Sequence, residues 1–236
     1  MNEKKDILGQ ALLDFHLKKE TGRLIIESEE LETEEMDIAY YFRNYDQMPE
    51  YEQIALELCR GKVLDVGAGA GCHSLYLQKI IKNVKAIDSS PAAVEVMKKS
   101  GVENALCIDL ADLKDEKFDS ILLLMNGIGI SGKLSSLENF LKHLTGLLLK
   151  GGQIIFDSTD LRYLYMEEDG SFWIDLNANY YGEVTYRYSY RNEVGEPFSW
   201  LFIDEENMLE IATTLGLKME VIYRNDDFHY LAVLTL

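Results

Sequence analysis

Short apolar runs alternate with amphipathic segments through the middle of the chain. Five buried strands are predicted, at Lys62–Gly67, Val84–Asp88, Asn104–Asp109, Phe118–Asn126 and Gln153–Ser158. The segments between them carry apolar residues at helical spacing. One of these helices would begin at Pro91 and end before Gly101, and another would run over residues 137–152 to a glycine pair. Strands that alternate with helices indicate crossover connections and a parallel sheet covered on both faces.

The pattern changes after Ser158. From Tyr180 to Arg191 apolar and polar positions alternate, which predicts a half-exposed strand, and a turn at Asn192–Gly195 leads to a second strand at Phe198–Phe202. A helix with Asp204 as its N-cap follows, and the chain finishes in two strands. Because the connection between those strands is short, they should pair in antiparallel fashion.

The first 60 residues have a different character. Their apolar residues recur at helical spacing, at Leu8, Leu12 and Phe15 and again at Tyr51, Ile54, Ala55 and Leu58. An acidic run, Glu27–Glu35, lies between the two groups and is expected to be an exposed connection. We therefore predict a helical N-terminal cap at residues 1–60 and an α/β domain at 61–236, with a β-hairpin insertion at about 178–203.

Composition narrows the classes of function. The chain has 236 residues, 47% of them hydrophobic, and a formal net charge of −18. An acidic protein without a cluster of Lys or Arg is a poor nucleic-acid binder, so a nucleic-acid partner is not expected. The first ten residues contain no apolar core typical of a signal peptide, and the longest apolar run, Ile121–Met125, is too short to span a membrane. We expect a cytoplasmic protein that has no membrane partner.

The three cysteines, Cys59, Cys72 and Cys107, lie far apart and form no CxxC pair. This spacing favours buried free thiols over a zinc site or a disulfide framework, so no metal is expected.

The segment VLDVGAGAGCH places Gly67, Gly69 and Gly71 directly after the first predicted strand. The next strand ends in Asp88, at a distance suited to an acid that binds ribose hydroxyls. A dinucleotide fingerprint would have its third glycine at Cys72, and the carboxylate of Asp65 would oppose a pyrophosphate. The turn therefore favours a ligand with a cationic end over one with phosphates.

From about Lys62 to its end, the chain resembles the class I S-adenosylmethionine-dependent methyltransferases. The resemblance lies in VLDVGAGAG, AIDSS, CIDLADL, FDSILLLMNGIG and LLLKGGQIIFDS, in the family's order. It implies S-adenosyl-L-methionine as cofactor and a doubly wound, mostly parallel, Rossmann-like seven-stranded sheet whose last strand is antiparallel. To that fold this chain would add its helical N-terminal cap and its β-hairpin.

The resemblance also implies roles for single residues. Asp65 and the turn of Gly67, Ala68, Gly69 and Gly71 would line the methionine part of the cofactor, Asp88 would hold the ribose, Ser89 would pack beside the adenine, Asp109 with the amide of Leu110 would read the adenine edge, and Asn126 would face the reactive methyl. A looser similarity to glycine-methylating N-methyltransferases calls for an arginine that grips the cofactor carboxylate. Met48 stands where that arginine would align, and Arg43 is the candidate to replace it.

The acceptor is less constrained by the sequence. A pocket could draw on Tyr40, Tyr41, Arg43 and Tyr45 and on Arg162, Tyr163 and Tyr165. An arginine in that pocket would suit a small molecule with a carboxylate. The tyrosine-rich hairpin with Trp200 could form a cage for an amine, pair a second subunit as a homodimer, or simply pack.

No catalytic residue is identified by the sequence. The four histidines, His16, His73, His143 and His229, form no recognisable catalytic pair. The prediction is a methyltransferase that acts on nitrogen or oxygen of a small molecule. The alternatives are a protein or RNA methyltransferase and a non-catalytic subunit that binds S-adenosylmethionine.

Overall fold

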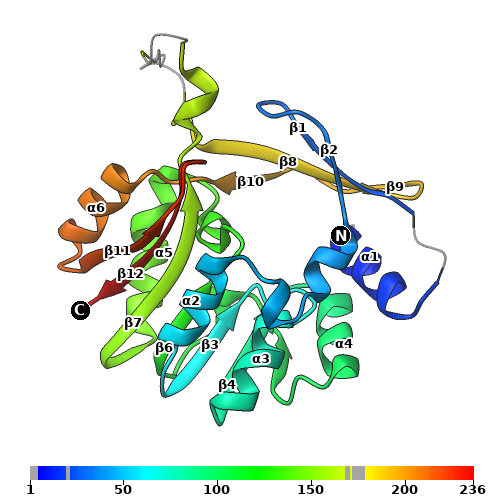
Figure 1. The fold of residues 1–236 in the computed structure, drawn as a ribbon, viewed down its shortest axis with the longest axis horizontal. Coiled ribbons are helices and arrows are strands. Elements are labelled where there is room, and N and C mark those ends of the chain that lie inside the picture. Colours follow the sequence, from blue (N-terminus) through cyan, green and yellow to red (C-terminus); the bar gives the residue numbers. More distant parts are fainter. Residues whose placement is uncertain (1–4, 20–21, 168–170, 172–178) are drawn as a thin grey trace.

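A seven-stranded sheet forms the centre of the protein, seen in a computed structural model that describes residues 5–19, 22–167, 171 and 179–236 (Figure 1). Its order is β11-β12-β7-β6-β3-β4-β5. The strands are β3 (Lys62–Val66), β4 (Asn83–Asp88), β5 (Ala105–Cys107), β6 (Phe118–Leu123), β7 (Leu148–Thr159), β11 (Lys218–Arg224) and β12 (His229–Thr235). Strands β3 to β7 run parallel, whereas β12 is antiparallel to both β7 and β11. The predicted doubly wound sheet is confirmed.

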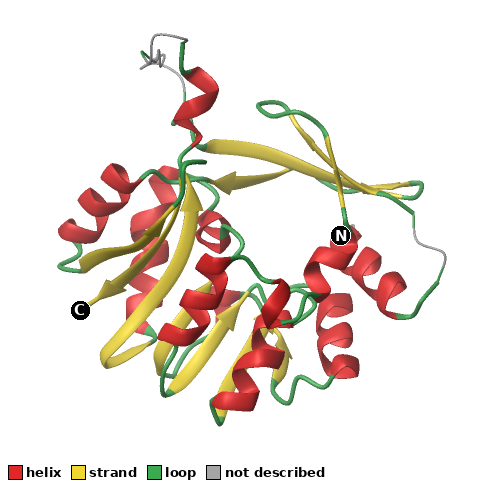
Figure 2. Ribbon diagram, in the orientation of Figure 1, coloured by secondary structure: helices red, strands yellow, loops and turns green. Residues whose placement is uncertain are grey.

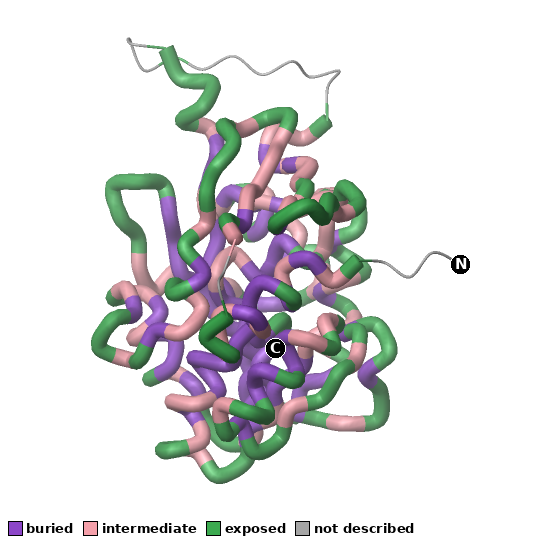
Figure 3. Tube along the Cα trace, turned by 90° about the vertical axis from the view of Figure 1, so that its right-hand side faces the viewer, coloured by how far each residue is buried: buried purple, intermediate pink, exposed green. Residues whose placement is uncertain are grey.

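Helices cover both faces of this sheet (Figure 2). On one face lie α2 (Glu50–Leu58), α3 (Cys72–Ile80) and α4 (Pro91–Ser100), and on the other lie α5 (Leu134–Gly146) and α6 (Glu205–Thr214). Alternate residues of one strand therefore enter different cores: Val63 packs with Leu56 and Leu77, and Leu64 packs with residues of α5 and α6. The buried segments gather in this α/β part of the molecule (Figure 3), which explains why its strands are apolar throughout.

A second, antiparallel sheet lies across the carboxyl ends of the parallel strands (Figure 1). Its order is β10-β8-β1-β2, and β9 extends β8. The strands are β1 (Leu24–Ser28), β2 (Glu34–Met36), β8 (Glu183–Tyr190), β9 (Glu193–Val194) and β10 (Phe198–Leu201). The pairing of β8 with β10 confirms the predicted hairpin, although the start of the insertion at about residue 178 lies outside the described residues. We call these five strands the roof sheet.

The predicted helical N-terminal cap also contains two strands, β1 and β2. Only α1 (Ile7–His16), the 3-10 turns Ile38–Phe42 and Tyr45–Gln47, and α2 are helical in the described part of residues 1–60. The acidic run is more than a connection, because its first residue, Glu27, belongs to β1, and Glu34 and Glu35 belong to β2. Strand β1 is short, and its main partner β8 lies far along the chain, where Leu24 pairs with Tyr190. Local periodicity gives no sign of such a partner.

Two further expectations need correction. Helix α5 ends at Gly146, and the leucine-rich segment after it is the start of β7, where Leu148 pairs with Phe118. A continuous apolar run suits a buried strand as well as a buried helix, so periodicity could not separate the two. Cys59 and Cys72 are buried free thiols as expected, but Cys107 is exposed because β5 is the edge strand.

The predicted caps of α4 and α6 are present. The Ser90 side chain accepts a hydrogen bond from the Ala93 amide, and Gly101 ends α4 in the left-handed conformation. Asp204 accepts from the Asn207 amide at the start of α6. In the described ranges, none of the helices combines the length and the apolar character that crossing a bilayer requires.

Candidate functional site

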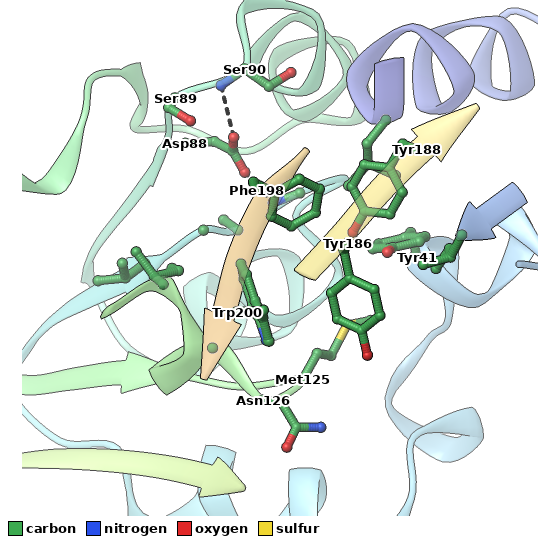
Figure 4. Close-up of a pocket in the computed structure, with 18 of the residues that line it drawn as sticks. Tyr41, Asp88, Ser89, Ser90, Met125, Asn126, Tyr186, Tyr188, Phe198 and Trp200 are labelled. Atoms are coloured by element: carbon green, nitrogen blue, oxygen red, sulfur yellow. Dashed lines mark hydrogen bonds between the residues drawn. The ribbon is translucent and has the colours of Figure 1, made fainter. Parts of the chain in front are cut away.

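A cavity of about 680 Å³ lies between the carboxyl ends of the parallel strands and the roof sheet (Figure 4). Open parallel sheets bind their ligands at this edge. All the residues predicted to bind the cofactor line it, except Gly71 and Arg43. Those that do are Asp65, Gly67, Ala68, Gly69, Asp88, Ser89, Asp109, Leu110 and Asn126.

The glycine turn brings bare backbone to the cavity wall. Gly67 and Gly69 have φ of 65° and 55°, in the left-handed region that favours glycine. A Cβ on Gly69 would lie 3.5 Å from the Tyr41 ring, so the aromatic ring covers the turn at close range. Gly71 has another use: a Cβ there would come within 2.8 Å of Val102 and 2.9 Å of Met97. It permits close packing of α3 on α4 and does not line the cavity.

Asp88 is fixed by two backbone donors. Its Oδ2 accepts from the Gly69 amide at 2.9 Å and its Oδ1 accepts from the Ser90 amide at 2.8 Å. Burial raises the pKa of Asp88, and these two hydrogen bonds partly offset that effect. Each carboxylate oxygen keeps a further acceptor position, which suits the two hydroxyls of a ribose.

Asp65 ends β3 beneath the turn and is only 2% exposed. It accepts a hydrogen bond of 2.6 Å from the Ser74 hydroxyl. Burial raises the pKa of the Asp65 carboxyl, whereas His73 and Ser74 act in the opposite direction. A buried carboxylate at a cavity wall favours a cationic ligand group, because such a group restores the stabilisation that water would supply.

Asp109 and Asn126 line the cavity, and both also form hydrogen bonds that fix the loops in which they lie. Asp109 accepts from the Ala111 amide at 2.9 Å and so caps a single 3-10 turn. Asn126 has φ of 54°, and its backbone N–H donates to Asp157 Oδ2 at 2.9 Å. Its Oδ1 accepts from the Thr159 hydroxyl at 3.3 Å, so the side chain is oriented by β7.

Arg43 does not line the cavity, because its side chain is part of a buried ion triad with Glu52 and His73. Its Nη2 donates to both carboxylate oxygens of Glu52, at 2.9 and 3.1 Å, and Glu52 Oε2 lies 2.8 Å from His73 Nε2. Burial lowers the pKa of His73, but Cys72, Glu52 and Asp65 outweigh that effect and leave it well above its usual value. His73, a residue to which the sequence assigned no role, is therefore the ionisable partner of Glu52 at the cavity wall.

The residues expected to form the acceptor pocket divide into two groups. Tyr40 and Tyr41 line the cavity, whereas the described lining residues do not include Tyr45, Arg162, Tyr163 or Tyr165. Tyr45 stacks on Tyr76 with ring centroids 4.2 Å apart, and Arg162 pairs with Asp160. Sequence reasoning missed Met125 and Ile130, which follow β6 and line the cavity. The apolar residues on either side of Asn126 were the sequence signal that could have identified them.

Four aromatic side chains of the roof sheet face the cavity: Tyr186, Tyr188, Phe198 and Trp200 (Figure 4). Phe198 lies at the centre of the group, with its ring centroid 6.1, 5.0 and 6.2 Å from those of Tyr186, Tyr188 and Trp200. The Trp200 ring reaches the loop after β6, where a Cβ on Gly129 would come within 2.1 Å of its Nε1. Gly129 thus leaves room for Trp200.

Replacing Gly129 by alanine should disturb the roof and spare the cofactor region. The added methyl group displaces Trp200, so we expect the KM for the methyl acceptor to rise by about tenfold, because a displaced wall misplaces the acceptor. Affinity for S-adenosylhomocysteine, measured by calorimetry, should stay within about threefold of wild type. Gly146→Ala is the matched control, because a Cβ there meets nothing within 4 Å. An unchanged KM in Gly129→Ala would contradict the assignment of Trp200 to the acceptor wall.

Comparison with known proteins identifies a family model and solved structures that are similar to this chain. Residues 64–156 match the family model described as a methyltransferase domain. A crystal structure of an S-adenosylmethionine-dependent methyltransferase from Bacteroides fragilis, in complex with S-adenosyl-L-homocysteine, is 41% identical in sequence with a TM-score of 0.91. The alignment covers 100% of this chain and 97% of that one. No curated protein has a significant match to the chain.

More distant structures share the fold. An S-adenosylmethionine-dependent methyltransferase from Clostridium acetobutylicum is 17% identical with a TM-score of 0.61, over 82% of this chain and 92% of that one. CalS10, an amino pentose methyltransferase from Micromonospora echinaspora solved with bound S-adenosylmethionine, is 16% identical with a TM-score of 0.56, over 87% of this chain and 99% of its own.

The cavity suits S-adenosylmethionine. The bare backbone at Gly67 and Gly69 leaves space that side chains would fill, Asp88 has acceptor positions for ribose hydroxyls, and Asp65 offers a carboxylate to a cationic group. Among the described residues, no three His, Cys, Asp or Glu side chains gather as a metal site.

Proposed function

Because this chain belongs to the S-adenosylmethionine-dependent methyltransferases, we propose that it transfers the methyl group to nitrogen or oxygen of a small molecule. The observation that carries this proposal is the roof sheet, which covers the carboxyl-end site and bounds a cavity of about 680 Å³. Pockets for small molecules commonly measure about 300–1,000 Å³. CalS10, which shares the fold, is named for a small acceptor, and its 16% identity supports the proposal through the fold alone.

When bound, S-adenosylmethionine supplies a methyl group that is already activated for transfer. The protein's own contribution is therefore position and exclusion of water. In this proposal Asp88 holds the ribose, Asp65 and the glycine turn hold the methionine end, and Asn126 borders the place where the acceptor meets the methyl group. The roof aromatics close that place from solvent.

Transfer of a labelled methyl group tests the proposal. The protein is incubated with S-adenosylmethionine labelled in the methyl group and with a cell extract divided by ultrafiltration into small molecules and macromolecules. We expect the small-molecule fraction to contain an enzyme-dependent labelled compound that chromatography separates from S-adenosylmethionine. Label in retained protein or RNA would overturn the small-molecule assignment, and an absence of any new labelled species from both fractions would indicate a non-catalytic subunit. The Asp88→Asn variant serves as the enzyme control.

A further inference from the structure

The cavity-facing side of the roof sheet is defined by its strand register. Tyr186 pairs with Phe198, and Tyr188 pairs with Ile26, so these side chains share one face. Ile26 in turn pairs with Glu34 of β2. Glu34 therefore stands on the same face as the aromatic residues, and it lines the cavity with them. Its neighbour Glu35 points to the opposite face, where it pairs with Arg23 at 3.0 Å.

Glu34 forms no hydrogen bond or ion pair through its side chain among the residues that the structure describes, whereas its neighbour Glu35 does. It lies near the aromatic group: burial chiefly raises the pKa of Tyr186, and the nearby Glu34 carboxylate adds to that rise. A carboxylate beside several aromatic faces is the arrangement that binds an organic cation, because both attract positive charge.

The cavity wall offers no free cation to an anionic acceptor within the part of the chain that the structure describes. Lys5 lines it but forms an ion pair with Glu193, and His73 is held by Glu52. Arg43 and Arg162, the two residues that would have favoured a carboxylate-bearing acceptor, do not line the cavity. Three glutamates of the wall, Glu32, Glu34 and Glu196, are instead exposed beside the roof.

We propose that the methyl acceptor is a small amine that is cationic in solution, held by the aromatic face of the roof sheet and by Glu34. This proposal rests on the proposed function and narrows it to N-methylation. It also separates the two ends of the cavity. Asp65 and Asp88 serve the cofactor at the glycine turn, and the roof serves the amine.

The transfer balances with no further reactant. The ammonium form of the acceptor first loses a proton to water, which leaves a lone pair on nitrogen. That nitrogen forms a bond to the methyl carbon while the bond from carbon to sulfur breaks, and its electron pair stays on sulfur. The methylated product is again an ammonium ion. The same aromatic face therefore binds both the acceptor and the product.

Binding of three matched probes tests the charge preference without turnover. Phenethylamine, phenethyl alcohol and phenylacetate have similar shapes and carry positive, zero and negative charge. Each is titrated by calorimetry into protein saturated with S-adenosylhomocysteine. We expect phenethylamine to bind most tightly and phenylacetate least. Equal affinities, or a preference for phenylacetate, would overturn the amine assignment and leave the methyltransferase assignment intact.

Variants of roof-sheet residues test whether this sheet causes the preference for the cationic probe. Glu34→Gln should reduce the preference for phenethylamine over phenethyl alcohol by about threefold to fivefold, as expected for an exposed charge. Glu35→Gln is the matched control on the opposite face and should leave the ratio unchanged.

Tyr186→Leu should reduce the ratio by about tenfold, whereas Tyr186→Phe should retain it. Because a general packing defect weakens both probes alike, a change in the ratio reports charge recognition. An unchanged ratio in Glu34→Gln and in Tyr186→Leu would contradict the proposed cage.

The label experiment then separates this proposal from the proposed function. Unreacted S-adenosylmethionine, which is itself a cation, is first removed by chromatography. The remaining labelled small molecules are passed over a cation exchanger at neutral pH, where a methylated amine is retained. Label that passes through would overturn N-methylation of an amine while upholding a small-molecule acceptor. Label confined to macromolecules would overturn both.

Discussion

The Asp88→Asn variant should bind S-adenosylhomocysteine about a hundredfold more weakly than the wild type, a loss of about 2.7 kcal/mol. Asp88 Oδ1 and Oδ2 each accept a backbone hydrogen bond, from Ser90 and Gly69. An asparagine has only one acceptor oxygen, so its amide nitrogen must face one of these N–H donors. The glycine turn loses its anchor, and the ribose loses a charged acceptor. Isothermal titration calorimetry measures the change directly.

Asp112→Asn is the control for this variant. Asp112 is a nearby, exposed acid that does not line the cavity, and its replacement should leave affinity unchanged within about twofold. Far-UV circular dichroism should show both variants folded. An affinity of Asp88→Asn within about threefold of the wild type would contradict the assignment of Asp88 to the ribose.

Replacement of Glu52 by glutamine should lower the free energy of unfolding by about 3–5 kcal/mol, the usual cost of breaking a buried ion pair. The Glu52 side chain is fully buried and joins Arg43 to His73. Without it, the guanidinium remains buried with no compensating charge, and the pKa of His73 loses one of the interactions that raise it. Urea denaturation gives the difference, and Glu50→Gln on the exposed face of the same helix should change stability by less than about 0.5 kcal/mol. A loss below about 1 kcal/mol would show that Arg43 and His73 find other partners.

The same triad gives the wild type a dependence of stability on pH. The pKa of His73 is raised, so its contribution is complete below its ordinary value of 6.5 and is lost as the pH rises through the folded-state pKa. Burial raises the pKa of Glu52, but His73 and Arg43 outweigh it, and the net pKa is lowered. The contribution of Glu52 is present above 4.5 and is lost as the pH falls through its lowered value. Unfolding curves of Glu52→Gln across this range should be flatter on both sides.

The parallel sheet could be predicted from the sequence because its signals are local. The apolar runs of β3, β4 and β6, the helix signals Pro91, Gly101 and Asp204, and the glycine turn each lie within a few residues of the element they define. The predicted cofactor residues that line the cavity follow from the same logic, because each lies at or shortly after the carboxyl end of a strand. Their placement around one cavity required only the order of the strands.

The ion triad and the joining of β1 and β2 to the predicted hairpin could not be predicted, since both depend on residues distant in sequence. Strand β1 pairs with β8, and the local sequence pattern around Leu24 does not indicate that its partner in the sheet is Tyr190. Arg43 was assigned to the cofactor as the substitute for an arginine that a loose family similarity calls for, whereas Glu52 holds it away from the cavity. His73 had no partner that the sequence could show, yet it is buried against Glu52. Partners of this kind follow from the fold, not from local sequence.

The roof sheet also sets an order of events during synthesis. Strands β1 and β2 leave the ribosome first, but β8 and β10 follow only after the glycine turn and most of the parallel strands. Until then β1 has β2 as its single strand partner in the described fold, and one of its edges stays open to unwanted pairing. Clustered carboxylates repel a second copy of the same strand, so we expect the charges of the segment Glu27–Glu35 to protect this edge. The acidic character of the segment thus has a use in the nascent chain before Glu34 takes its place in the cavity wall.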